Sequence, residues 1–414
     1  MGIVLVLVMF GWFSKRTSKL DFKSKRVAYL GLLGLIAFSF VLNTYIETVL
    51  RWENGVAGVD LLAHFQGAEA IANGTPLNQL YKVNYRFALQ FSNLGYLLYA
   101  LFLSVVSFFP VIISERFSLQ FMYIIQCIIA VWGILNVSDF FSDLNLGSSE
   151  KAILNSQKKR VSLELMLFSC VCIAQAASVL MRDIWIFYFI SLLLHECKPT
   201  GHARKSVCIF LIIITTILRI YTLIITLPIF IGYGLKKKKL AVFSTLGGCL
   251  LFFVGQVVIQ QLAVFMNILW EYDFTFNLQN MIEFMLFPNI LTQTAAIQNM
   301  ATGYHALFGG NCEWIYYLLA CWNVFAMPIV AYGGIQCIRQ RKWSDFFLWG
   351  LILLAVCLLY AVFYDNVSEP RHKLMLIYSY CFFFAEGITK MRKKAKLIYL
   401  FLFLLVIIFI LAFA

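Results

Sequence analysis

The sequence predicts an all-α membrane protein whose helices form a polytopic transmembrane bundle. Hydrophobic residues make up 62% of the 414 residues and charged residues only 13%, whereas an ordinary soluble domain carries about a quarter charged residues. Several apolar stretches approach or exceed the roughly 20 residues that a helix needs to cross about 30 Å of hydrocarbon. A transmembrane β-barrel would instead show alternating strands of about ten residues. We therefore expect about 11–12 helical spans in a single integral membrane domain that covers residues 1–414.

The Lys and Arg residues predict which ends of these helices lie inside. Of the 33 Lys and Arg residues, 25 fall in six short runs between the apolar stretches. Cytoplasmic loops hold such residues because translocation of a short basic loop is disfavoured. The six runs cover 15–26, 151–160, 198–205, 236–239, 339–342 and 390–396. Orientation and attraction to anionic headgroups thus account for the net charge of +13, and we expect no nucleic-acid partner.

Placing the six runs inside orders the helices along the chain. The expected spans are 27–50, 117–138, 161–181, 184–197, a broken pair of 207–218 and 220–235 around Arg219, 240–268, 313–338, 346–364, 373–389 and 397–414. Residues 51–93 then form a long first outer loop, and residues 269–312 form a second long outer segment. Residues 94–113 are expected to be a re-entrant or interfacial helix, because a full crossing would place the basic run at 151–160 outside.

The N-terminal residues and the cysteines have simple interpretations. Residues 1–13 are apolar but short and lack a preceding basic segment, so they suggest a partial span or an irregular start rather than a cleaved signal peptide. The eleven cysteines lie mostly within apolar stretches and form no CxxC pair or disulfide framework. We expect them to be small apolar packing residues.

The first outer loop holds an acid that suits catalysis. Asp60 follows a Gly-containing turn at the start of a helical pattern. Its carboxylate could cap that helix by accepting a backbone N–H, or act as a general base that takes a proton from an acceptor hydroxyl. Glu53, His64 and Glu69 share the loop and are candidates for supporting acids or acceptor-binding residues.

Three further charged residues interrupt apolar stretches. Arg182 and Asp183 stand between two expected spans, where charge beside hydrocarbon is costly and marks a functional candidate. The alternative is an Arg–Asp pair that closes a tight outer turn. Arg219 has no acid near it in sequence, so it must reach an acid on another helix, a water-filled cavity or a bound anion.

The last outer segment carries a basic cluster. Arg371, His372 and Lys373 follow Glu369 and Pro370. Because the six inner runs account for the topology, anion binding explains this outer cluster better, and Arg matches phosphate oxygens with paired N–H donors. The alternative is that the cluster neutralises Asp365 and Glu369.

Other chemistries find little support. His305 lies in the second outer segment with several aromatic residues, which could form a membrane-interface belt or stack on sugar rings. It is a candidate acceptor-binding residue. Neither HxxxH nor HExxH occurs, so no metal site is predicted. No P-loop, GxGxxG or GxSxG is present, so we expect no cofactor, although a divalent cation stays open.

The order of these features resembles the GT-C class of multi-span glycosyltransferases and the related repeat-unit polymerases of bacterial surface polysaccharides. The shared pattern comprises an acid in Val59-Asp60-Leu61, the re-entrant stretch at 94–113, the Arg182-Asp183 turn and the late cluster Glu369-Pro370-Arg371-His372. It covers roughly residues 27–390. Many members carry a second acid beside the first-loop acid, and here Leu61 follows Asp60 instead. A large soluble C-terminal domain is absent, so transfer of oligosaccharide to protein is not expected.

The resemblance implies an inverting glycosyltransferase with a polyprenyl-(di)phosphate-linked donor, such as an undecaprenyl-linked sugar, and a glycan acceptor. It would act at the outer face of the bacterial inner membrane and polymerise repeat units of O-antigen, capsule or exopolysaccharide beside partners of an export pathway. Asp60 would be the catalytic base, and Arg371 and His372, with Lys373, Arg182 and Arg219, would bind donor phosphate. Asp183 and Glu369 are further candidates for supporting acids or acceptor-binding residues, and a second acid beside Asp60 would come from Glu53, Glu69 or Asp183, or be unnecessary. The alternatives are a transporter or flippase of lipid-linked oligosaccharide, and a non-catalytic membrane scaffold.

Overall fold

The computed structural model describes residues 2–48, 115–144, 150–178, 182–199, 203–265, 313–363 and 373–391, together with residue 201 and short pieces within 66–79 and 395–405. This described part of the chain is helical and contains no strand. Its elements are α1 (Gly2–Thr17), α2 (Phe22–Thr48), α5 (Glu115–Asp143), α6 (Glu150–Phe168), α7 (Val171–Ser178), α8 (Asp183–Glu196), α9 (Lys205–Leu218), η4 (Ile220–Thr222), α10 (Leu223–Ile229), η5 (Phe230–Gly234), α11 (Lys238–Phe265), α15 (Glu313–Arg339), α16 (Trp343–Phe363), η6 (Leu374–Leu376) and α18 (Ile377–Lys390).

Most helices coincide with the apolar stretches that predicted them. The broken pair is confirmed, because α9 ends at Leu218 and a 3-10 turn follows Arg219. The expected span at 161–181 differs: it begins earlier, at Glu150, and divides into α6 and α7, which meet at an angle of 56°. Its first half, in which Arg160 pairs with Glu164, contains the whole basic run at 151–160. Sequence hydropathy alone did not reveal this polar extension.

Two helices of the described chain are long and apolar enough to cross a membrane. These spans are Phe22–Thr44 in α2 and Gln120–Asp143 in α5, and the bent pair of α6 and α7 would make a third. The expected re-entrant stretch at 94–113 and the second outer segment at 269–312 lie outside the described residues. Most of the first outer loop at 51–93 lies outside them as well.

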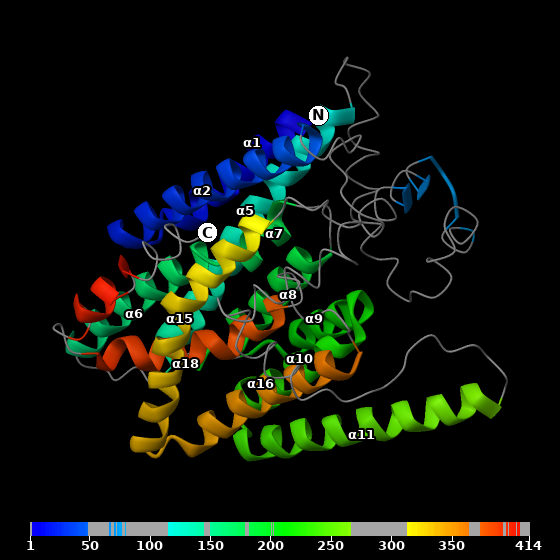
Figure 1. The fold of residues 1–414 in the computed structure, drawn as a ribbon, viewed down its shortest axis with the longest axis vertical. Coiled ribbons are helices and arrows are strands. Elements are labelled where there is room, and N and C mark those ends of the chain that lie inside the picture. Colours follow the sequence, from blue (N-terminus) through cyan, green and yellow to red (C-terminus); the bar gives the residue numbers. More distant parts are fainter. Residues whose placement is uncertain are drawn as a thin grey trace.

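The central helix of the described bundle is α5. It packs against α1, α2, α6 and α8, and α18 also contacts it. On one edge α1 lies beside α2 (Figure 1), with the Phe13 and Tyr29 rings 5.2 Å apart. On the opposite edge α11 runs along α16. The buried aromatic side chains Phe140, Phe141 and Trp349 fill the space between α5 and α16.

Glycines bring α15 and α18 into backbone contact. A Cβ on Gly333 would overlap the carbonyl oxygen of Phe383, and one on Gly387 would overlap that of Ile329. Small residues of this kind allow helices to approach closely where no water drives their association. The crossing of these two helices is visible in Figure 1, where α15 is yellow and α18 orange.

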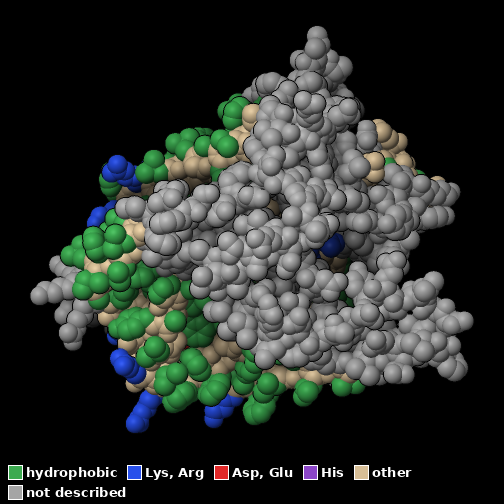
Figure 2. All heavy atoms as spheres, in the orientation of Figure 1, with side chains coloured by type: hydrophobic (Ala, Val, Ile, Leu, Met, Phe, Trp, Pro, Cys, Tyr) green, Lys and Arg blue, Asp and Glu red, His purple; other side chains and the backbone are tan. Residues whose placement is uncertain are grey.

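Where the structure describes the surface, it is strongly apolar. Figure 2 shows a wide hydrophobic area with Lys and Arg side chains at its margin, beside the part of the chain that is not described. Large exposed apolar residues include Leu33, Phe40, Phe243 and Leu250. Continuous exposed apolar area on this scale marks an interaction or membrane surface. Of the nine cysteines whose side chains the structure describes, Cys249 is half-buried and the other eight are buried, and none of the nine forms a disulfide. This burial agrees with the packing role expected of them.

Candidate functional site

Four of the predicted site residues lie in the described part of the chain: Arg182, Asp183, Arg219 and Lys373. The remaining eight lie outside it, namely Glu53, Asp60, His64, Glu69, His305, Glu369, Arg371 and His372. The role of Asp60 as a general base therefore stays a prediction. The described four show how one end of the bundle is organised.

Arg219 forms a buried ion pair at the helix break. After α9 ends, Arg219 adopts an extended backbone (φ −160°, ψ 109°) before the 3-10 turn η4 begins. Its Nη1 donates to Asp183 Oδ1 at 2.6 Å, and the two side chains are only 8% and 2% exposed. Of the three environments expected for Arg219, the structure therefore shows an acid on another helix.

Neighbouring groups hold Arg219 in this position. The guanidinium carbon lies 5.1 Å from the centre of the Tyr221 ring, a cation–π distance. The Thr222 hydroxyl donates to the carbonyl oxygen of Arg219 at 2.8 Å, and the amide of Arg219 donates to the Thr215 carbonyl at 2.8 Å. The first of these two hydrogen bonds gives the Arg219 carbonyl a partner at the break, and the second is the last bond of the α9 ladder. Arg219 is thus fixed in both its backbone and its side chain.

Lys373 lies at the same level of the bundle as Asp183. Near the start of α8 and of α18, the Phe187 and Tyr378 rings stack 5.9 Å apart. The other ends of both helices lie near adjacent residues of α6, because Glu386 contacts Lys159, and Lys198 after α8 shares Asp139 with Arg160. The two helices therefore run in the same direction. The Tyr378 hydroxyl also donates to the Phe187 carbonyl at 3.2 Å. Phe187 comes four residues after Asp183 and Tyr378 comes five residues after Lys373. Each charged residue therefore precedes its ring by about one helical turn.

The structure thus brings four predicted site residues to one end of the bundle. We call this end the Asp183 level and define it by Arg182, Asp183, Arg219 and Lys373. Asp183 and Lys373 are each 1% exposed, and Arg182 is half-buried. Three cations and one acid from three separate segments of sequence lie at this level. Such a level offers positive charge in a setting with little water, which suits an anionic ligand.

The opposite end of the bundle, which we call the basic end, joins five of the six basic runs through buried acids. Asp139 pairs with Arg16 at 3.1 Å, with Arg160 at 2.7 Å and with Lys198 at 3.1 Å. One carboxylate on α5 therefore ties α1, α6 and the loop after α8 together.

Two further acids complete the basic end. Glu386 lies 2.7 Å from Lys342 and 3.5 Å from Lys159. Asp345 lies 2.6 Å from Lys238. The sixth run begins at Lys390, one helical turn after Glu386. The expectation that the basic runs share one end of the helices is consistent with this arrangement, since the described runs are connected through three carboxylates.

Sequence reasoning did not identify the acids Asp139, Asp345 and Glu386. Each stands in or beside a strongly apolar stretch, and that setting alone marks a residue that needs a charged partner. The sequence therefore indicates that each of these acids needs a charged partner, but which residue is that partner depends on how the helices pack.

Among the residues that the structure describes, no group of three or more His, Cys, Asp or Glu side chains is arranged to hold a metal ion. Comparison of the chain with protein-family models, with curated proteins and with solved structures finds no match.

Proposed function

We propose that this chain is a polytopic, GT-C-like membrane glycosyltransferase of about 11–12 spans. It would take a polyprenyl-(di)phosphate-linked sugar or oligosaccharide as donor at the outer face of a bacterial inner membrane. Its product would be a surface polysaccharide built by polymerising repeat units with inversion at the anomeric carbon. No nucleotide is needed at that face, because the donor's phosphoester bond supplies the free energy.

The observation that carries this proposal is the charge at the Asp183 level. Helix α8 runs from Asp183 to Glu196 near the basic end, and thirteen residues of α helix span roughly 20 Å. The basic end is explained by membrane orientation. Membrane orientation does not explain the cations at the Asp183 level, since this level lies the length of α8 away from the basic end and Arg219 and Lys373 are buried there. A donor phosphate at headgroup depth would account for cations placed there.

The proposed chemistry is a single displacement. The acceptor hydroxyl oxygen attacks the anomeric carbon, and the bond from that carbon to the phosphate oxygen breaks. The polyprenyl (di)phosphate leaves with the electron pair, while the Asp60 carboxylate takes the hydroxyl proton. Arg182, Arg219, Arg371, His372 and Lys373 would stabilise the charge that develops on the leaving phosphate. Asp183 would orient Arg219 through their ion pair.

One observation favours a second candidate, a transporter or flippase of lipid-linked oligosaccharide. Transporters commonly bind substrate where a membrane helix is discontinuous. Here the helix breaks at Arg219, and α10 continues into the π-helical segment η5. Under this alternative the same cations would bind the phosphate, and Asp60 would be dispensable.

The experiment that tests the proposal compares two carboxylate substitutions in the reconstituted protein. Liposomes that contain the wild-type chain receive a polyprenyl-diphosphate-linked oligosaccharide, and the products are resolved on a gel. We expect Asp60→Asn to abolish the polymer ladder. The matched control is Asp21→Asn at the basic end. Asp21 accepts the amide of Ser24 at the start of α2, and Asn caps a helix about as well as Asp.

Three outcomes discriminate the candidates. A ladder that is lost in Asp60→Asn and kept in Asp21→Asn supports the enzyme. A full ladder from Asp60→Asn removes Asp60 from the mechanism. Movement of the labelled donor across the liposome membrane without any ladder, equally in wild type and Asp60→Asn, would establish the transporter instead.

A further inference from the structure

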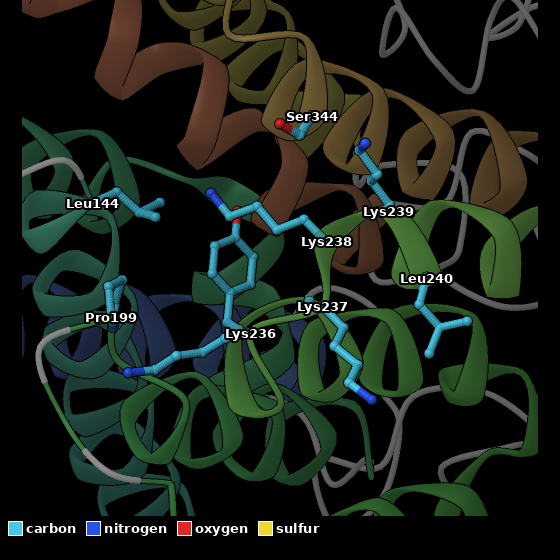
Figure 3. A pocket seen from close by; sticks show the side chains of 10 residues that line it. Leu144, Pro199, Lys236, Lys237, Lys238, Lys239, Leu240 and Ser344 are labelled. Carbon is cyan, nitrogen blue, oxygen red and sulfur yellow. The ribbon is translucent and has the colours of Figure 1, made fainter.

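A pocket at the basic end lies far from the Asp183 level. It has a volume of about 710 Å³ and lies at the turn between η5 and α11, bounded on its other sides by Leu144, Pro199 and Ser344. Lys236, Lys237, Lys238 and Lys239 all line it (Figure 3). Leu240 at its edge begins the exposed face of α11. The pocket is large enough for a small ligand or a headgroup, since such sites measure roughly 300–1,000 Å³.

The charge of this pocket is one-sided. None of the described residues that line it is acidic. Lys238 alone among its four lysines forms an ion pair in the described structure, with Asp345 at 2.6 Å. Asp345 is fixed in turn, because the Tyr233 hydroxyl donates to it at 2.9 Å and receives the Trp349 indole N–H at 2.8 Å. Lys236, Lys237 and Lys239 are exposed.

The stability of the local fold does not account for these lysines. Cations at the N-terminus of a helix oppose the helix macrodipole, and α11 begins at Lys238. Lys236 also adopts a left-handed backbone with φ of 58°, which Gly or Asn adopts at lower cost. Membrane orientation explains basic residues here but not a cavity between them. An anion in the pocket would offset the repulsion among the lysines.

An exposed apolar stripe leads away from the pocket along α11. Leu240, Phe243, Leu246, Leu250 and Val254 are between 43% and 69% exposed. Their spacing of three or four residues places them on one face of the helix. The stripe is roughly 21 Å long, somewhat more than one leaflet of a hydrocarbon core about 30 Å thick. An acyl chain whose headgroup occupied the pocket could lie along this face.

We propose that this pocket binds the phosphate-bearing headgroup of an anionic membrane lipid, with the acyl chains along the α11 stripe. Charge selects the phosphate, since basic pockets between membrane helices bind anionic headgroups. The apolar stripe distinguishes a lipid from a free phosphate or diphosphate, which would gain nothing from it. This site lies at the opposite end of the bundle from the Asp183 level and does not depend on the proposed glycosyl transfer.

Photolabelling of the full chain in nanodiscs tests this site. The probe is phosphatidylglycerol with a diazirine on one acyl chain, diluted into phosphatidylcholine, and peptides are mapped by mass spectrometry. We expect label on residues 240–254. The variant Lys236→Asn with Lys239→Gln should raise the probe concentration for half-maximal labelling by roughly thirtyfold, about fivefold per lysine. Asn at 236 keeps a residue that tolerates the left-handed backbone.

The matched control removes two exposed lysines elsewhere at the basic end, Lys23→Gln with Lys25→Gln in α2. A loss of labelling as large as in the pocket variant would mean general surface attraction and would overturn the site. Equal labelling by a phosphatidylcholine probe would overturn headgroup selection. If inorganic pyrophosphate without lipid raised the thermal stability as much as phosphatidylglycerol does, the ligand would be a soluble anion. Should the double variant not fold, Lys239→Gln alone is expected to show about a fivefold effect.

Discussion

Removing the carboxylate charge of Asp183 should destabilise the folded protein severely. In Asp183→Asn, the guanidinium of Arg219 stays buried beside a neutral amide. The wild-type pair is 2.6 Å apart, and the Arg219 side chain is only 8% exposed. At an effective dielectric constant of about 20, two unit charges at this distance attract by roughly 6 kcal/mol. The side-chain oxygen of Asn can still accept a hydrogen bond from Arg219, so part of this attraction is retained.

We expect a loss of about 3–5 kcal/mol in the free energy of unfolding, as for other buried pairs that lose one partner. The measurement is reversible unfolding in mixed micelles with increasing dodecyl sulfate, followed by circular dichroism. The double variant Asp183→Leu with Arg219→Met should be less destabilised than Asp183→Asn, because it leaves no buried charge without its partner.

An exposed ion pair provides the control. Arg204 and Glu196 are as close as 2.5 Å, yet the Arg204 side chain is 70% exposed. Arg204→Gln should therefore leave the unfolding free energy without a measurable change, since solvent screens such pairs. An unchanged unfolding free energy in Asp183→Asn, or a double variant that is less stable than Asp183→Asn, would contradict this expectation. Either result would mean that burial does not determine the contribution of the Asp183–Arg219 pair.

Two further predictions concern packing and the basic end. Gly333→Ala should destabilise the fold by at least about 1–3 kcal/mol, as overpacking does, because its Cβ would overlap the Phe383 carbonyl. Gly334→Ala is its control and should be neutral or slightly stabilising in the same unfolding assay, since a Cβ at Gly334 would lie 4.0 Å from its nearest neighbour, the Phe383 ring. Equal effects of the two substitutions would contradict the close approach of α15 and α18. Asp139→Asn should leave Arg16, Arg160 and Lys198 around an uncharged side chain and cost roughly 3 kcal/mol. Stability equal to that of Asp21→Asn would show that Asp139 does not hold this end together.

The helical class and most helix boundaries of the described chain could be predicted from local composition. The helix break at Arg219 is an example, because a charged residue inside a long apolar stretch indicates a site where the membrane helix is interrupted. The bend between α6 and α7 was missed, since residues 161–181 form one apolar stretch in the sequence. Asp60, most of the first outer loop and the second outer segment at 269–312 lie outside the described residues, so their predicted roles stay predictions.

The sequence by itself determined that this protein is helical and strongly apolar and that its basic runs punctuate the apolar stretches. These properties depend on the hydropathy and charge of short segments, which can be read directly from the sequence. Only the tertiary structure decided which charges meet. It paired Arg219 with Asp183, placed Lys373 at the same level through the contact of Tyr378 with Phe187, and gathered three basic segments on Asp139. The physical reason is that a buried charge requires a partner, while the identity of that partner depends on the direction and depth at which separate helices pack.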